Sequence, residues 1–129
     1  MSGAGSDALE AFAMQAVASD ALDGVLAAAP GLVCVYLWGY DCFNCDIAKG
    51  QMLLNESRVK ALGFDWLECN VYADTRMRDR FALHGVPAFF FFQGGRKLGR
   101  ITGWPGIAAF CEAVERLQLK TGVSAPISA

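Results

Sequence analysis

The sequence predicts an α/β fold in which a central mixed β-sheet carries helices on both faces. Apolar, β-rich runs alternate with amphipathic stretches along the 129-residue chain, as they do where helices connect parallel strands. A late Gly94-Gly95 pair between two such runs predicts an antiparallel hairpin. With 54% hydrophobic residues, the chain can form one domain. We expect it at residues 11–119, between a disordered start (residues 1–10) and a flexible tail (residues 120–129).

The strands are predicted from composition and periodicity. The run Leu32–Leu37 (LVCVYL) is apolar throughout, which is typical of a central strand covered on both faces. The other runs are shorter or alternate in polarity, and the first of them is the weakest signal. These predicted strands are Ala11–Val17, Phe64–Val71, Pro87–Gln93 and Lys97–Thr102.

Helices are predicted where capping residues precede apolar positions at helical spacing and Gly or Pro follows. The longest, Cys42 to Leu62, contains Gly50, which indicates a bend or a close packing contact. The last, Trp104–Leu119, carries an apolar stripe on one side. Two more are expected, from a cap at Ser19 or Asp20 to Ala29 and from a cap at Asp74 to Gly85.

Charge narrows the class of protein. The net charge of −2 argues against a nucleic-acid-binding surface. No Lys or Arg precedes Lys49, so the start of the chain lacks the positive region of a secretory signal. The uncharged run Gly24–Tyr40 is short for a membrane span and contains Pro30-Gly31. We therefore expect a cytoplasmic or similarly reducing setting, with no membrane and no nucleic acid as partner.

Two of the five cysteines stand apart from the rest. Cys34, Cys69 and Cys111 lie in apolar surroundings and are predicted to be buried thiols. Cys42 and Cys45, in WGYDCFNCDIAKG, lie where a strand leads into a helix. The start of a helix favours a negative charge and hence a reactive thiolate at Cys42. Cys45 follows one turn later on the same face, which suits an attacking and a resolving thiol.

A cysteine pair at this spacing can also bind a metal or simply be buried. A structural zinc site needs four ligands, whereas this chain offers one pair and a single, distant histidine, His84. Iron–sulfur ligation across a dimer and two inert buried cysteines are the remaining alternatives. The pair follows polar Asp41 at the end of a strand, which favours redox chemistry over a core position. We predict no metal and no bound cofactor, because a Cys42–Cys45 disulfide would carry the electrons.

In this arrangement the sequence resembles the thioredoxin family. Trp38 and the CFNC motif match W-x-x-x-C-x-x-C, Val86-Pro87 stands 45 residues after Cys42, and Gly103 follows the last strand. The resemblance covers about residues 11–119 and implies the thioredoxin fold, with Pro87 in the cis form near the cysteines. It also implies protein disulfides as substrates, positioned by the backbone of Val86, and a thioredoxin-reductase-like or small-thiol electron donor.

The sequence departs from the family pattern at two places. Phe43 and Asn44 replace the usual Gly-Pro between the cysteines, which leaves the redox potential open. Tyr36 occupies the position of the buried acid that assists the resolving thiol. We hypothesise that Glu68, from the next strand, replaces that acid as a proton relay, hydrogen-bonded to Tyr36. Asp41, next to Cys42, should oppose thiolate formation modestly.

Aromatic residues near the motif predict a docking surface for protein partners. Trp38, exposed Phe43 and Trp104, which follows Gly103, could form an apolar substrate-binding patch. The same patch would serve a thioredoxin-fold adaptor or co-chaperone with little redox turnover, which is the main alternative function. A glutaredoxin-like enzyme is a second alternative, but no basic clamp for glutathione is recognisable near Pro87.

Overall fold

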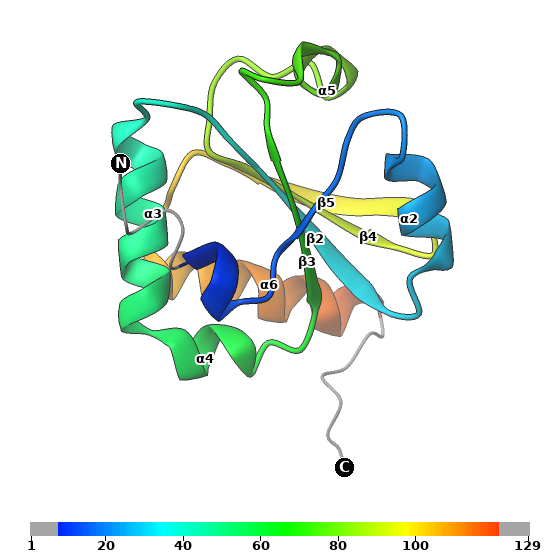
Figure 1. The fold of residues 1–129 in the computed structure, drawn as a ribbon. Helices are drawn as coiled ribbons and strands as arrows, with labels where there is room; N and C mark the ends of the chain where they lie inside the picture. Colours follow the sequence, from blue (N-terminus) through cyan, green and yellow to red (C-terminus); the bar gives the residue numbers. More distant parts are fainter. Residues whose placement is uncertain (1–7, 122–129) are drawn as a thin grey trace.

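The computed structural model describes residues 8–121 and contains a five-stranded sheet of order β1-β3-β2-β4-β5 (Figure 1). Strands β1, β3 and β2 run parallel, whereas β4 is antiparallel to both β2 and β5. The predicted mixed α/β sheet is confirmed. The strands are β1 (Gln15–Ala16), β2 (Leu32–Trp38), β3 (Asp65–Asn70), β4 (Ala88–Gln93) and β5 (Arg96–Thr102).

Helices cover both faces of the sheet, as predicted. One face packs on α3 (Phe43–Leu54), α4 (Glu56–Lys60) and α6 (Ile107–Thr121); the other packs on α2 (Leu22–Ala28) and α5 (Thr75–Arg80) (Figure 1). Because β2 is central, its residues from Leu32 to Leu37 are all buried. This accounts for the unbroken apolar run in the sequence.

The expected helix from Cys42 to Leu62 is instead two helices, α3 and α4. The break lies at Asn55, which leaves the helical region with φ −123° and ψ 37°. Its side-chain amide donates a hydrogen bond to the Gln51 carbonyl at 2.8 Å, so a short polar side chain competes with the helical backbone. Gly50, where a bend was expected, lies inside α3, and a Cβ there would meet nothing within 4 Å.

The structure differs more from the sequence prediction at the start of the chain. The expected strand Ala11–Val17 is reduced to the two residues of β1, because residues 8–11 form a helical turn and Ala13 has φ 52°. Ala8, within the expected disordered start, is fully buried. The other expectations for this start, at residues 1–7, lie outside the described residues.

Elements near the other end also differ in extent. Helix α5 ends at Arg80, earlier than expected, since Ala82 has φ 50°. Helix α6 begins at Ile107 rather than at Trp104 and continues to Thr121, within the expected tail. The tail residues 122–129 lie outside the described residues. The hairpin glycines Gly94 and Gly95 have φ 59° and 81°, as a tight turn between strands requires.

The three remaining cysteines are buried free thiols, as predicted. Burial raises the pKa of the Cys69 thiol to about 11 and also raises the pKa values of Cys34 and Cys111. These thiols are therefore poor nucleophiles near neutral pH. Among residues 8–121, no helix combines the length and the apolar character that crossing a membrane requires.

Candidate active site

A tight loop joins β2 to α3 and presents the first cysteine. Gly39 in this loop lies close to the ring of Tyr72: a Cβ there would be 2.7 Å from the ring, so the half-exposed Tyr72 side chain would have to move. Asp41 follows with φ 48°, and Cys42 is the N-cap of α3. The backbone N–H of Cys45 donates to the Cys42 Sγ at 3.1 Å. An N-cap sulfur that accepts such a bond is stabilised as a thiolate.

The two cysteines of the motif differ in exposure. Their Sγ atoms lie within disulfide-bond distance, and their Cα atoms are 5.1 Å apart. Cys42 is partly exposed, whereas Cys45 is fully buried on the inner side of α3. An incoming sulfur can therefore reach Cys42 first, and Cys45 can react only with a group already attached to Cys42.

The segment before β4 lies beside the exposed sulfur. The Val86–Pro87 peptide bond is cis, and the Val86 carbonyl oxygen lies 3.5 Å from the Cys42 Sγ. The Gly103 N–H donates to the Pro87 carbonyl at 2.8 Å, which ties the end of β5 to the same place. Folding thus brings together Cys42, Val86, Pro87 and Gly103, all of which were candidates from the sequence.

Glu68 lies on β3, the strand next to β2, as expected, but its hydrogen-bond partner differs from the expected one. The Trp38 Nε1–H donates to the Glu68 Oε1 at 2.7 Å. The expected hydrogen bond between Tyr36 and Glu68 is wrong, since the Tyr36 hydroxyl has no partner among residues 8–121. The two residues are register partners, but the Tyr36 ring stacks on Phe89 at 5.1 Å, within the core. Burial raises the pKa of Tyr36 far above its usual range.

Lys49 is a member of this site that was not predicted from the sequence. Its side chain is only 4% exposed, and its Nζ lies 4.2 Å from the centroid of the Trp38 ring. Burial lowers the pKa of Lys49, while the carboxylates of Asp46 and Glu68 oppose that shift. The Trp38 indole therefore contacts an ammonium on its face and a carboxylate through its N–H.

A signal for Lys49 is visible in the sequence of α3. The buried positions of this helix are Cys45, Ala48, Lys49 and Met52, which recur at helical spacing. Lys49 lies one turn after Cys45 on this inner stripe. A lysine on an otherwise apolar stripe is unusual, and it indicates either a long side chain that reaches solvent or a functional charge.

Replacing Lys49 with Met should raise the stability of the protein at neutral pH. The lowered pKa means that the folded environment disfavours the charged form. Removing that charge should raise the free energy of unfolding by about 0.5–1 kcal/mol. The gain is small because the Trp38 ring and the carboxylates of Asp46 and Glu68 already offset part of the cost of burying the charge. Urea denaturation with the Cys42–Cys45 disulfide intact measures the difference.

The effect of Lys49→Met on stability should depend on pH in a defined direction. Between the lowered folded pKa and the ordinary value of 10.5, the unfolded chain holds more protons at Lys49 than the folded one. Wild-type stability should therefore rise with pH across this window, and the advantage of the variant should shrink. Lys60→Met, at an exposed residue, is the control. A variant less stable than wild type at pH 7 would contradict the prediction.

The aromatic residues near the cysteines divide into two groups. Phe43 is 77% exposed, and Tyr40 and Tyr72 are 58% and 50% exposed. Trp104 does not extend the open surface as expected: its ring packs on Phe110 at 5.3 Å and its indole donates to Gln51. We call Phe43, Tyr40 and Tyr72 the exposed aromatic group.

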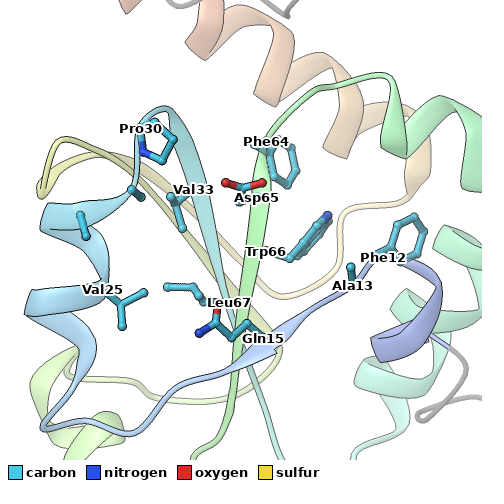
Figure 2. Close-up of a pocket in the computed structure, with 12 residues that line it drawn as sticks. Phe12, Ala13, Gln15, Val25, Pro30, Val33, Phe64, Asp65, Trp66 and Leu67 are labelled. Carbon is cyan, nitrogen blue, oxygen red and sulfur yellow. The ribbon is translucent and has the colours of Figure 1, made fainter.

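A hollow at the opposite end of the sheet is separate from this chemistry. It measures about 530 Å³ and lies between α2, the segment before β1 and the start of β3 (Figure 2). Phe12, Val25 and Trp66 are among its lining residues, and no cysteine lines it. Within the described part of the chain, no three His, Cys, Asp or Glu side chains converge on a possible metal position.

Comparisons with known proteins relate the chain to others through its structure. No model of a protein family and no curated protein matches the sequence. Among solved structures, thioredoxin from Fasciola hepatica superposes with a TM-score of 0.67 at 16% identity, covering 80% of this chain and 98% of that one. Thioredoxin f2 from Chlamydomonas reinhardtii gives 0.63 at 15% identity, covering 83% and 95%. At these identities the likeness establishes a shared fold.

Proposed function

We propose that this chain, which has the thioredoxin fold, is a thiol–disulfide oxidoreductase that reduces protein disulfides through Cys42 and Cys45. One observation carries the proposal: a partly exposed sulfur caps a helix, within bonding distance of a buried partner sulfur. A structural disulfide needs neither an accessible sulfur nor a helix cap, so the difference in exposure between Cys42 and Cys45 favours a reactive pair over an inert one.

The proposed reaction has two exchange steps. The Cys42 thiolate attacks one sulfur of the substrate disulfide, and the other substrate sulfur leaves as a thiolate. The resulting mixed disulfide is then attacked by Cys45, which forms the Cys42–Cys45 disulfide and releases the second substrate sulfur. Two electrons pass to the substrate, so no bound cofactor is required. A thioredoxin-reductase-like protein or a small thiol must then reduce the pair again.

Substrate binding is proposed on the segment beside Cys42. An extended substrate chain could donate a backbone N–H to the Val86 carbonyl, as in the addition of a strand to a sheet. Pro87 and Gly103 would fix the position of this carbonyl through their mutual hydrogen bond. Phe43 would contact the substrate directly, while Trp38 and Trp104, both half-buried, would support the loop beneath it.

Glu68 is proposed as the group that takes up the proton of Cys45 before the second step. The Trp38 indole N–H holds the Glu68 carboxylate at this site, and the Trp38 ring contacts Lys49, which lies one helical turn after Cys45. Neither the indole nor an ammonium accepts a proton, so the proton of Cys45 would reach the carboxylate through water. The ammonium of Lys49, one helical turn from Cys45, would favour the thiolate over the buried thiol. A buried thiol needs such help, because burial alone disfavours the charged form.

A binding adaptor is the second candidate, favoured by the exposed aromatic group beside the cysteines. Insulin reduction with dithiothreitol as donor separates the two functions. We expect wild-type protein to accelerate the reaction strongly and Cys42→Ser to fall to the rate without protein. Equal rates for both proteins would favour the adaptor. We place either function in a reducing compartment, where the buried thiols Cys34, Cys69 and Cys111 stay unpaired.

A further inference from the structure

We propose that the substrates of this reductase carry acidic residues two to four positions from the reacting cysteine, held by a basic surface on the Val86-Pro87 side of the site. The inference rests on the proposed function and specifies its substrate class. It concerns two grooves that flank residues 83–86 of the chain, the segment that ends beside Cys42.

Each groove contains an arginine. The first, about 450 Å³, includes Pro87, Gly103, Phe90 and Arg100, and we call it the Arg100 groove. The second, about 330 Å³, includes Val71, Tyr72 and Arg78, and we call it the Arg78 groove. Both are also lined by the shared wall of Leu83, His84, Gly85 and Val86.

Every charged side chain that lines these two grooves is an arginine. The other lining residues with ionisable side chains are His84, which is never negative, and the phenol Tyr72, and no Asp or Glu lines either groove. Arg78 lies 3.8 Å from Asp79, but both side chains are exposed, so this contact competes weakly with a ligand. The carboxylates of Glu68 and Asp74 line a different hollow, beside Trp38.

Arg100 and Pro87 line the same groove from the two sides of the β4–β5 hairpin. Arg100 is the register partner of Phe90, three residues after Pro87, and it projects on the same face of the sheet. One arginine, Arg100, therefore lines the same groove as Pro87, although no basic clamp near Pro87 was recognisable in the sequence. The two residues are far apart in the sequence, because β5 returns beside β4 only after the Gly94-Gly95 turn.

The grooves lie within reach of the residues next to a substrate cysteine. The shared wall ends at Val86, whose carbonyl oxygen is 3.5 Å from the Cys42 Sγ. An extended chain advances about 3.3 Å per residue, so side chains two to four positions from that cysteine reach the grooves. The half-buried ring of Phe81, which packs on buried Phe90, provides apolar surface for the stem of Glu, and the arginines can bind its carboxylate.

The test uses three peptide disulfides that differ only at positions two and three after the reacting cysteine: Glu-Glu, Gln-Gln and Lys-Lys. We expect wild-type kcat/KM to be about tenfold higher for Glu-Glu than for Gln-Gln, and lowest for Lys-Lys. The preference should weaken as salt is raised, since the groups are exposed. In Arg78→Glu/Arg100→Glu, the order of the Glu-Glu and Lys-Lys peptides should reverse.

The control is Arg116→Gln, which removes an exposed arginine on α6 and should keep the wild-type order. Equal kcat/KM for all three peptides in wild type would overturn the inference, while leaving the proposed reductase intact. No reduction of any peptide would instead contradict the proposed function itself. If glutathione disulfide were the one substrate whose reduction depended on Arg78 and Arg100, the acidic-segment inference would also be overturned.

Discussion

Cys45→Ser should convert the protein into a trap that keeps its substrate. Cys42 is the accessible sulfur, so the first exchange step should proceed and leave a mixed disulfide. The hydroxyl that replaces the buried Cys45 thiol cannot attack it. We expect turnover to fall by roughly a hundredfold or more, with one substrate chain bound per protein. Non-reducing electrophoresis and mass spectrometry measure the adduct, which a thiol reagent should release.

The matched controls for this prediction are single cysteine variants. Cys42→Ser should form no adduct, because Cys45 is fully buried and has no access to substrate. Cys111→Ala should behave as wild type, since Cys111 is a buried free thiol of α6 that belongs to the core. Wild-type turnover by Cys45→Ser would show that the two sulfurs do not act in sequence, and the proposed mechanism would have to be abandoned.

Glu68→Gln should slow the second exchange step by about a hundredfold near pH 7, if Glu68 accepts the proton of Cys45. The substitution keeps the shape and the acceptor oxygen that bonds the Trp38 indole, and removes only the basic group. The rate should recover as pH rises, because solvent hydroxide then takes the proton instead. Rapid-quench measurement of mixed-disulfide decay follows this step apart from the first one.

Asp65→Asn is the control for Glu68→Gln. Asp65 is exposed at the other end of β3, three residues earlier, and lines the hollow that contains no cysteine. It should leave the pH profile of the second step unchanged. Superimposable profiles for wild type and Glu68→Gln would remove Glu68 from the mechanism, although Cys42 and Cys45 could still carry the reaction.

The charged groups beneath the cysteines are arranged differently from what the family resemblance implied. Where the family has a buried acid, this chain has Tyr36, whose ring belongs to the core. The carboxylate comes from β3 as Glu68 and the cation from α3 as Lys49, with the Trp38 indole between them. If the proposed relay operates, the acid and base functions lie on elements other than β2.

Local patterns in the sequence were sufficient for predicting the mixed α/β sheet and the close cysteine pair. The apolar run of β2, the hairpin glycines and the cysteines at a helix start each depend on neighbours in the chain. Such features follow from periodicity, capping and backbone conformation, which act over a few residues. They predicted the mixed sheet, the helices on both faces and the close approach of Cys42 to Cys45.

Only the tertiary structure decided which side chains meet across different elements. It gave Glu68 the Trp38 indole as its hydrogen-bond partner, where Tyr36 was expected, and it buried Lys49. It also turned Trp104 inward and placed Arg100 in the groove that Pro87 lines. These contacts depend on strand register, on packing against a helix and on the choice between competing partners. Register, packing and the choice of partner all involve residues far apart in the chain, so no local pattern in the sequence predicts which partner a side chain reaches.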